Sequence, residues 1–599
     1  MKLKFILCLL LSGIFFQIKA QQYSIIPQPV MVIPGTGTFD FSYSVNIVFD
    51  KEQNENADYL NQYLAKYYSV RPILGGGMKK KIALRNPGIQ TDNLFQHDDE
   101  YTLSITGDSI IIKGSSAGVF YGIQTLLQLM PAEKISSFQI PCCDIHDYPR
   151  FSWRGMHLDC ARHFFSVEFV KKYIDMMAYY KLNMFHWHLT DDQGWRIEIK
   201  QYPLLTQIGS YRKETMVEKN FDPYIGDKTP VDGFYTQEQV KEIVQYAAKR
   251  HITIVPEIEM PGHSQAAIAA YPELACYGNN YEVWTKWGVT NVTLCPTSDV
   301  IQFYENILSE IISLFPGKYI HIGGDEVPDD HWKKSKQVAE LMHEKNLQTY
   351  AQVEAYFINQ IEQYVISKGK KIIGWDEILE GGVSQSATIM SWRGTEGGVA
   401  AAKKGNDAVM TPGKYCYFDH CQSQNPLEPI CIGGYLPLDT VYSYDPMPSQ
   451  LSADESMHIL GAQANVWTEY ISTGDKIEYM IFPRMLALSE VLWTQKKNMD
   501  YWNFIGRLEK HFELLNMRGI NYRVPDVKIE VRTMDGNKFM IGMSCIETDA
   551  MIHYTLDGSN PTETSLSYLE PLTLTAEECK KLKAIAITKS GKRSLIISN

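Results

Sequence analysis

The chain has 599 residues, with 57 Lys and Arg against 69 Asp and Glu, so its formal net charge at pH 7 is −12. This acidic balance excludes nucleic acid as the expected partner and a polybasic membrane anchor, because both need a basic surface. Hydrophobic residues make up 45% and charged residues 21%, which is ordinary globular usage and excludes a disordered chain.

The first twenty residues have the pattern of a secretory signal peptide. Lys2 and Lys4 precede an apolar run over 5–16, and the small residue Ala20 comes just before Gln21. That run is too short to span a bilayer, and no later stretch of about 18 uncharged apolar residues predicts a membrane span. We therefore expect residues 1–20 to be removed and the protein to be periplasmic or secreted from a bacterium.

Ten of the eleven cysteines remain after that cleavage, and an oxidising compartment permits disulfides between them. Cys276 and Cys295 lie on either side of a Trp-rich loop. The sequence does not decide between a disulfide joining them and two free thiols. No CxxC pair occurs, so the cysteines predict no zinc site. The other cysteines of interest are Cys416, Cys421 and Cys431 in one loop, and Cys142, Cys143 and Cys160, for which buried thiols and bridges are equally open.

Residues 21–147 predict a small α+β domain. Two strand-like runs, 101–106 and 109–113, flank a Gly107-Asp108 turn, a pattern typical of a hairpin. The apolar run 118–130 predicts a helix that ends at Pro131. No catalytic side chains gather here, so we expect this domain to be a scaffold.

Residues 148–524 show a repeating strand-then-helix pattern, which predicts a parallel sheet. Amphipathic segments such as 167–180, 237–249, 301–314 and 350–367 follow the strands, and all eleven Trp lie in this region. Eight such units in about 350 residues fit a (β/α)8 barrel. The strand candidates are 153–159, 182–189, 251–258, 319–323, 371–375, 387–392, 407–411 and 459–466.

After about Pro525 the pattern changes to short strands, at 551–556 and 582–588, with turn residues such as Asp557-Gly558. Residues 525–599 therefore predict a small β-sandwich. The predicted architecture is an α/β protein: a TIM barrel with an N-terminal α+β domain and a C-terminal β-sandwich domain.

Polar or Trp residues follow all eight predicted strands, at the end where barrel enzymes hold their active sites. The most informative run is His321-Ile-Gly-Gly-Asp325-Glu326, in which two glycines allow a tight turn before two adjacent carboxylates. Adjacent side chains on extended chain diverge, so the pair divides its labour: Glu326 as general acid with a raised pKa, Asp325 staying ionised. The alternative is an acidic pair at a helix start.

Three Trp residues past strand ends offer flat apolar walls that suit the CH faces of a sugar, although core aromatics are the alternative. Charged side chains at the same end offer charge-assisted hydrogen bonds to hydroxyl groups. The Trp residues are Trp375, Trp392 and Trp467, the charged ones are Arg162, Asp419 and Glu469, and Tyr417 adds a phenolic donor.

Two other classes of protein compete with a glycosidase. His186 and His188 share one face of a strand, and His263 with Asp376 completes a candidate metal site, which would make a metal-dependent barrel hydrolase. The Trp walls have no role in that hypothesis. A non-catalytic glycan-binding protein is the third class, and the intact Asp325-Glu326 pair argues against it.

Several motifs together resemble family 20 of the glycoside hydrolases, the β-N-acetylhexosaminidases and chitobiase-like enzymes, over nearly the whole mature chain. The last 75 residues are similar to a small C-terminal domain of some members, through the run Ile552-His-Tyr-Thr-Leu-Asp-Gly-Ser-Asn-Pro-Thr. The barrel motifs are Asp159-Cys-Ala-Arg162-His-Phe-Phe, His186-Trp-His-Leu-Thr-Asp-Asp-Gln-Gly-Trp-Arg196, Pro261-Gly-His263, His321-Ile-Gly-Gly-Asp-Glu326, Gly374-Trp-Asp-Glu377 and Asn465-Val-Trp-Thr-Glu469.

This resemblance implies a retaining exo-hydrolase that removes terminal, non-reducing β-linked GlcNAc or GalNAc from oligosaccharides or glycoconjugates. The acetamido oxygen of the substrate would be the nucleophile and would form an oxazolinium-like intermediate. No cofactor and no metal are expected. The choice between the two sugars, the natural polymer (chitin fragments, N-glycans or mucin chains), release of a disaccharide instead, and the oligomeric state stay open.

The resemblance also implies a role for each candidate residue. Glu326 would protonate the leaving oxygen and then activate water, while Asp325 would hold the acetamido N–H. The other implied roles are Tyr417 as donor to the acetamido oxygen, Trp375, Trp392 and Trp467 as walls, Arg162, Asp419 and Glu469 as hydroxyl ligands, and Asp191 and His263 as a supporting relay.

Overall fold

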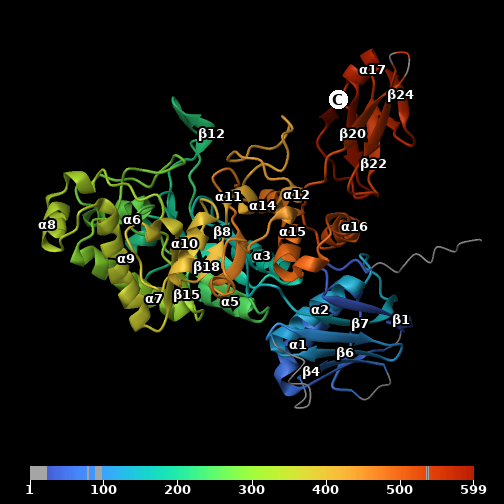
Figure 1. Ribbon diagram of the computed structural model, residues 1–599, viewed down its shortest axis with the longest axis horizontal. Coiled ribbons are helices and arrows are strands. Elements are labelled where there is room, and N and C mark those ends of the chain that lie inside the picture. The colour runs from blue at the N-terminus through green and yellow to red at the C-terminus, as the bar shows by residue number, and fades with distance from the viewer. Residues whose placement is uncertain are drawn as a thin grey trace, which may run out of the picture.

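The computed structural model describes residues 23–42, 44–76, 80–87, 97–278, 280–534, 536 and 538–599. The predicted signal peptide, residues 1–20, lies outside the described residues. Figure 1 shows three parts along the chain: a sheet domain in blue, a central helix-rich barrel and a small sheet domain in red. Among the described residues, no helix combines the length and apolar composition that a membrane crossing needs.

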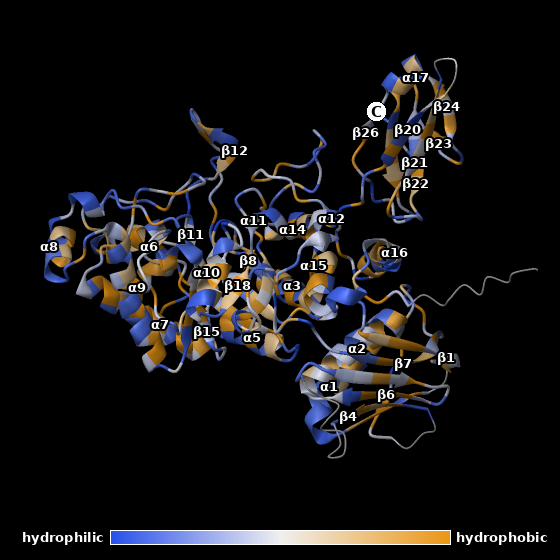
Figure 2. Cartoon of the chain, in the orientation of Figure 1, coloured by the Kyte–Doolittle hydropathy of each residue, from blue (hydrophilic) through white to orange (hydrophobic). Residues whose placement is uncertain are grey.

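A seven-stranded sheet forms the first part, in the order β1-β7-β5-β6-β4-β2-β3. The predicted hairpin is the antiparallel pair β5–β6, and the predicted helix is α2, whose N-cap Ser115 accepts a hydrogen bond from the Gly118 amide. Figure 2 shows hydrophobic residues along these strands. The strands are β1 (Met31–Asp40), β2 (Asn46–Phe49), β3 (Ile73–Leu74), β4 (Lys81–Arg85), β5 (Tyr101–Ile105), β6 (Ser109–Gly114) and β7 (Gln139–Asp147), with helices α1 (Asn54–Tyr68) and α2 (Ser116–Leu129).

Eight parallel strands close into a barrel, in the order β14-β15-β16-β17-β18-β19-β8-β9, which confirms the predicted fold. Several strands are shorter than predicted. The chain leaves β15 after His321 because Gly323 and Gly324 turn it with φ values of +69° and +84°. The strands are β8 (Trp153–Asp159), β9 (Met184–His188), β14 (Thr253–Glu257), β15 (Tyr319–His321), β16 (Lys371–Trp375), β17 (Thr388–Ser391), β18 (Ala408–Met410) and β19 (Ile459–Ala464).

Helices surround the barrel, and most of the longer ones begin at side-chain caps, which satisfy their free N–H groups. Ser166, Thr236 and Thr349 each accept a hydrogen bond from the backbone three residues on. The longer helices are α3 (Val167–Tyr179), α5 (Gln237–Ala248), α7 (Ser298–Leu314), α8 (Lys336–Glu344), α9 (Tyr350–Ser367), α10 (Glu396–Lys404), α14 (Gly474–Ile481), α15 (Arg484–Trp493) and α16 (Tyr501–Met517).

Shorter elements lie in the loops around the barrel. The short helices are α4 (Leu204–Gln207), α6 (Gln265–Ala270), α11 (Gly413–Cys416), α12 (Leu438–Ser443) and α13 (Ala453–Ser456). The short strand pairs are β10 (Thr190–Asp191) with β11 (Gly194–Trp195), and β12 (Met216–Phe221) with β13 (Tyr224–Gly226). The β12–β13 hairpin projects from the barrel (Figure 1).

A buried ion pair joins the first part to the barrel. The Nζ of Lys181 lies 2.8 Å from a carboxylate oxygen of Asp147, and Trp493 Nε1 donates to the other oxygen at 2.9 Å. Both charged side chains are completely buried. Removing either partner would leave an uncompensated buried charge, which costs several kcal/mol, about 3–5 in measured cases.

Two small sheets form the C-terminal part, as expected of a small β-sandwich. Their orders are β20-β21-β24 and β23-β22-β25-β26, and buried side chains such as Ile541 and Ile552 come from both. The strands are β20 (Lys528–Met534), β21 (Lys538–Ser544), β22 (Met551–Thr555), β23 (Leu566–Ser567), β24 (Leu572–Thr575), β25 (Lys583–Ile587) and β26 (Ile597–Ser598), with helix α17 (Ala576–Lys581).

The structure decides the open questions about cysteines. Cys276 and Cys295 form a disulfide. A second disulfide joins Cys421 and Cys431. The remaining cysteines singled out in the sequence are buried free thiols: Cys142, Cys143, Cys160 and Cys416.

Candidate active site

A cavity of about 150 Å³ lies at the carboxyl ends of the barrel strands. It brings together every predicted site residue except Asp419, and adds two that were not predicted, Glu259 and Ile432. Strand ends of a parallel barrel converge at one face, so residues far apart in sequence meet here. The lining residues are Arg162, Asp191, Glu259, His263, Asp325, Glu326, Trp375, Trp392, Tyr417, Ile432, Trp467 and Glu469.

The two adjacent carboxylates are held in different surroundings by the turn after β15. Glu326 itself has φ +49°, and a Cβ on Gly323 would lie 1.6 Å from the Glu259 carboxylate. The turn therefore needs glycine there, and it places the two acids at different depths. The predicted divergence of the two side chains was wrong, because both carboxylates lie within 3.8 Å of His263 Nε2. The Asp325 side chain is 13% exposed, whereas that of Glu326 is 44% exposed.

The pKa values of Asp325 and Glu326 are shifted in the opposite directions from those predicted, in which Glu326 has the raised pKa. Burial raises the pKa of Asp325 to about 6, and the nearby Glu257 and Glu326 carboxylates add to the effect. A hydrogen bond with His263 lowers the pKa of Glu326. The prediction of a raised pKa for Glu326 was wrong because this side chain faces the opening of the cavity and has a cationic partner.

His263 connects Glu326 to the buried Asp191. Its Nδ1 lies 3.2 Å from Asp191, and its Nε2 lies 3.5 Å from Glu326 and 3.8 Å from Asp325. Burial opposes a charge on the imidazole, but Asp191 and Asp325 raise the pKa of His263 well above its usual range. His263 is therefore a cation that touches both carboxylates of the pair.

Arg162 and Asp191 form the buried base of the cavity. An Arg162 Nη atom lies 2.9 Å from Asp191, and Nε donates to Gln193 at 2.9 Å. The guanidinium carbon also lies 5.1 Å from the ring centre of Trp467. Burial opposes ionisation of Asp191, but Arg162 and His263 hold its pKa below the usual range. This network fixes the position of every member before a ligand binds.

Two carboxylates beside this network have unused hydrogen-bonding capacity. Among the described side chains, neither oxygen of Asp419 and not Oε2 of Glu469 has a hydrogen-bond partner, although these atoms are buried. Burial raises the pKa of both groups, and their proximity raises that of Asp419 further. Buried acceptors without partners are costly unless a ligand supplies donors, so they suit hydroxyl groups.

Aromatic side chains form the walls. Trp375 is 1% exposed and donates through Nε1 to Glu257 at 2.9 Å. Its ring centre lies 5.9 Å from that of Trp467, while Trp392 and Tyr417 stack at 6.2 Å. These contacts orient the faces of the rings and give a narrow apolar slot.

Tyr417 is placed by the chain on both sides of it. It lies just after α11 and pairs with Asn465 beyond the end of β19. The Phe418 amide donates to the Asn465 carbonyl at 2.8 Å, which fixes the backbone next to Tyr417. The predicted phenolic donor therefore lines the cavity from a loop.

The metal site predicted from histidines is not formed as proposed. His186 and His188 lie deep in the barrel around Glu257, which also contacts His321. Among the described residues, no group close enough to share an ion combines His186 and His188 with His263. His186 and His188 point into the barrel from one strand, whereas His263 lies on a loop after β14.

Asp376, the remaining residue of the predicted metal site, also has another partner. Asp376 accepts a hydrogen bond from Arg393 Nε at 2.6 Å. His188 has its pKa raised to about 10, because Glu257 and Asp191 outweigh the effect of burial. A protonated imidazole has no lone pair for a metal, so His188 acts here as the counter-ion of buried carboxylates.

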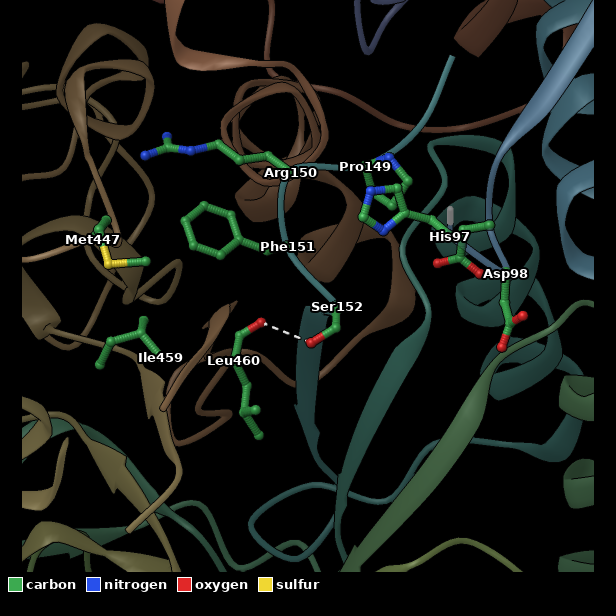
Figure 3. A pocket seen from close by; sticks show the side chains of 10 residues that line it. His97, Asp98, Pro149, Arg150, Phe151, Ser152, Met447, Ile459 and Leu460 are labelled. Atoms are coloured by element: carbon green, nitrogen blue, oxygen red, sulfur yellow. Dashed lines mark hydrogen bonds between the residues drawn. The ribbon is translucent and has the colours of Figure 1, made fainter. Parts of the chain in front are cut away.

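A larger hollow of about 710 Å³ lies at the opposite end of the barrel strands (Figure 3). Phe151 and Ser152 precede β8 there, and Ser152 donates to the Leu460 carbonyl of β19 at 3.2 Å. None of the predicted catalytic or substrate-binding residues lines it. Volume alone therefore does not mark the chemical site of this molecule.

Sequence reasoning missed Glu259 and Ile432. Burial raises the pKa of Glu259 well above its usual range, and the nearby Asp325 adds to this effect, so burial and Asp325 both favour its protonated form. Its place two residues after Glu257, on the same strand end as the Pro261-Gly-His263 motif, was a usable signal. Ile432 lies in a loop without any motif, and its sequence context carried none.

Comparison with known proteins agrees with this geometry. The family described as "Glycosyl hydrolase family 20, catalytic domain" matches residues 151–496, its domain 2 matches 22–148, and "Fn3 associated" matches 541–599. A β-hexosaminidase of Porphyromonas gingivalis is 45% identical over 510 residues, which is 83% of this chain and 64% of that protein. A β-hexosaminidase of Vibrio furnissii is 36% identical over 479 residues, 78% of this chain and 76% of that protein.

Solved structures are similar as well. The GH20 exo β-N-acetylglucosaminidase of Vibrio harveyi, in complex with N-acetylglucosamine, has a TM-score of 0.75 at 34% identity, covering 84% of this chain and 78% of that one. The Flavobacterium johnsoniae chitobiase has a TM-score of 0.71 at 32% identity, covering 84% and 74%. The catalytic-domain match spans more than half of the chain and includes every residue of the cavity, so the chain belongs to glycoside hydrolase family 20.

Proposed function

We propose that this protein is an exo-acting, retaining β-N-acetylhexosaminidase that removes terminal, non-reducing β-linked GlcNAc or GalNAc. The observation that carries the proposal is the placement of Asp325 and Glu326 against one atom inside a small cavity: His263 Nε2 lies 3.8 Å from Asp325 and 3.5 Å from Glu326. An ordinary retaining glycosidase places two carboxyl groups about 5 Å apart across the scissile bond. Adjacent residues that meet at one imidazole nitrogen do not face each other across such a bond, so we infer that the nucleophile comes from the substrate.

The acetamido group of the sugar supplies this nucleophile. Its carbonyl oxygen bonds to the anomeric carbon while the bond from that carbon to the glycosidic oxygen breaks, and Glu326 gives its proton to the departing oxygen. Glu326 then takes a proton from water, whose oxygen attacks the anomeric carbon and reopens the ring intermediate. Two inversions retain the configuration, and the substrate-assisted route is a recognised exception among glycosidases.

Asp325 serves the acetamido group in this scheme. As a carboxylate it accepts the acetamido N–H and balances the positive charge that develops on the oxazolinium ring, which is a charge-assisted interaction in a site with little water. Its pKa of about 6 predicts loss of this role in more acidic solution. The raised pKa of Glu259 beside it disfavours a second negative charge there.

The acid role of Glu326 requires a protonated side chain when the sugar is bound. A sugar in the cavity would cover the exposed part of this carboxyl group and exclude water, which raises a carboxyl pKa. His263 opposes this shift at first and offers a proton path to Asp191. The free protein and the complex with a sugar therefore differ most in the protonation state of Glu326.

The rest of the cavity favours exo action on one sugar. The Trp rings enclose its CH faces, and Asp419, Glu469 and Arg162 offer ligands for its outer hydroxyls. The end of the cavity beneath these residues is closed by buried side chains. Only the terminal residue of a polymer can therefore enter it.

Side-by-side hydrolysis of nitrophenyl β-GlcNAc, β-GalNAc and β-glucoside tests the proposal. Cleavage of the two N-acetylated sugars but not the glucoside is expected, because only they carry the nucleophile. Equal cleavage of the glucoside would refute substrate assistance. Binding of N-acetylhexosamine without any hydrolysis would instead support the glycan-binding alternative.

We also propose that the protein is exported to the periplasm or beyond. The signal-like pattern of residues 1–20 and the two disulfides, Cys276–Cys295 and Cys421–Cys431, support this proposal. Fractionation of the producing cells tests it, with the mature N-terminus expected at Gln21. Full recovery of an unprocessed chain from the cytoplasm would overturn it.

A further inference from the structure

A loop between α11 and α12, residues 421–435, reaches the opening of the cavity, and we call it the rim loop. The Cys421–Cys431 disulfide closes most of it, and the Leu436 amide donates to the Cys421 carbonyl at 2.9 Å. Beneath it, the fully buried Arg484 donates to the carbonyl of Leu436 at 3.0 Å. The base of the rim loop is thus fixed to the barrel.

Ile432, the residue after the disulfide, lines the cavity together with Glu326. It is 38% exposed, unlike Trp375 at 1%, so it stands at the opening rather than in the interior. Lys219 of the β12–β13 hairpin donates to the Ile432 carbonyl at 2.9 Å, which ties the rim loop to the hairpin. Both elements lie on the same side of the barrel (Figure 1).

The C-terminal part holds the other side of the rim loop. Asn425 Nδ2 donates to the carbonyl of Ile596, next to β26, at 2.9 Å. Glu428 pairs with Arg523, in the segment that leads to β20, at 3.0 Å, and accepts from the Tyr479 hydroxyl at 3.0 Å. The side chains of Glu428 and Arg523 are 4% and 8% exposed, so this ion pair is little screened by solvent.

We propose that Ile432 forms the apolar side of a subsite for the leaving group, and that the C-terminal part positions it through the rim loop. The inference rests on the proposed function. In a cavity closed at its inner end, the leaving group lies at the opening, next to the acid that protonates it. Ile432 is the large aliphatic side chain of the cavity lining at that opening. Its ligand is the CH face of a sugar or an aromatic ring.

This assignment gives the C-terminal part a role other than sugar binding. The part contains no Trp, so it has no broad stacking platform of its own. Asn425, Glu428 and Arg523 are positioning residues, which act on the substrate only through the place they give to Ile432. A change in them should reproduce the effect of an Ile432 change in weaker form.

The test compares Ile432→Ser with the matched variant Ile430→Ser. Ile430 lies in the same loop at 40% exposure and does not line the cavity. For each variant we would measure kcat/KM on the β-1,4-linked disaccharide of GlcNAc and the inhibition constant of free N-acetylglucosamine. The free sugar fills the inner cavity alone, so its inhibition constant also reports an intact, folded site.

Ile432→Ser is expected to lower kcat/KM on the disaccharide by about five- to tenfold, the range for loss of part of one aliphatic contact. The inhibition constant should stay within about twofold, since the free sugar makes no contact with the subsite. Ile430→Ser should change neither quantity, and Asn425→Ala should lower kcat/KM by about two- to threefold with the same inhibition constant.

Equal effects of Ile432→Ser and Ile430→Ser would overturn the subsite while leaving the proposed function intact. An inhibition constant that rises together with the loss in kcat/KM would also overturn it, because Ile432 would then serve the inner sugar. Failure of the unsubstituted protein to hydrolyse the disaccharide or any N-acetylated glycoside would overturn the proposed function itself.

Discussion

Replacement of Glu326 by Gln removes the carboxyl proton that Glu326 would transfer but keeps the size of the side chain. Gln has the same size and still offers an oxygen to His263 Nε2, which lies 3.5 Å from the Glu326 carboxylate. The Glu326 side chain is 44% exposed, so the substitution leaves no buried group without a partner. We therefore expect a folded variant that binds N-acetylglucosamine as tightly as the unsubstituted protein but has no proton to give.

The size of the loss should depend on the leaving group. General acid catalysis contributes about 100- to 10,000-fold, and a sugar alkoxide needs that proton fully. Loss of kcat/KM on the GlcNAc disaccharide should therefore reach about 1,000-fold or more, which is roughly 4 kcal/mol of transition-state stabilisation. A nitrophenolate leaves as a stable anion, so the first step with nitrophenyl β-GlcNAc should lose only about tenfold.

The assay compares the loss of kcat/KM on the GlcNAc disaccharide with the loss on nitrophenyl β-GlcNAc, using the same protein preparations. A second measurement follows the pre-steady-state release of nitrophenolate. Slow activation of water in the second step should produce a burst, because Glu326 is also the base. The pH profile of the variant should lack the limb that reports this carboxyl group. Equal losses on both substrates, or nearly normal turnover of the disaccharide, would refute the acid role of Glu326.

Three further predictions concern Asp325, a carboxyl group on α9 outside the cavity, and the removal of metal ions. Asp325→Asn should lower kcat/KM on nitrophenyl β-GlcNAc by about 100- to 1,000-fold, because the carboxylate that faces the oxazolinium charge is lost, and a smaller effect than that of Glu259→Gln would count against its role. Burial raises the pKa of Glu354 on α9 to about 8, so the folded state binds more protons than the unfolded state between about pH 4.5 and 8 and stability falls as pH rises through that window. Glu354→Gln should therefore raise the free energy of unfolding by roughly 4 kcal/mol at pH 8 and leave it almost unchanged at pH 4, as urea titrations at both pH values would show. Dialysis against EDTA should leave hydrolysis unchanged, and recovery of a lost rate by added zinc would return a metal to the mechanism.

The barrel and its active face could be predicted because polar or Trp residues follow each apolar strand, and the packing of the strands does not require them there. Buried parallel strands read as short apolar runs, and the polar residues after them mark the face where such ends meet. Asp325, Trp375 and Glu469 are far apart in sequence, yet the same rule places all of them in one cavity. Alternation within β5 and β6 and the turn between them likewise predicted the hairpin.

The histidines show where the same rule misleads. His186 and His188 alternate along β9 and point into the barrel, a pattern that also suits metal ligands. Inside the barrel they surround the fully buried Glu257, which hydrogen-bonds to His188 and Trp375 and lies 3.0 Å from His186 Nε2. Sequence shows which side of a strand a histidine occupies, but not whether a carboxylate from a neighbouring strand has already neutralised it.

Ile432 and the Cys421–Cys431 bridge were beyond prediction for a different reason. Long loops carry no periodicity, so nothing in the run 421–435 indicates which side chain turns towards the cavity. Its position depends on contacts of this loop with Lys219 and with Ile596 of the C-terminal part, both more than a hundred residues away in sequence. Only the folded chain brings these anchors together.

The carboxylate pair illustrates the limit most sharply, because its chemistry depends on direction rather than composition. Gly323 and Gly324 turn the chain so that Asp325 faces the interior and Glu326 the opening. Burial therefore raises the pKa of Asp325, while His263 lowers that of Glu326. The proposed acid role needs the reverse order, which a bound sugar would supply: its N–H would stabilise the Asp325 anion, and its bulk would exclude water from Glu326. On this argument the catalytic protonation state belongs to the complex, and the free protein is poised for binding rather than for proton transfer.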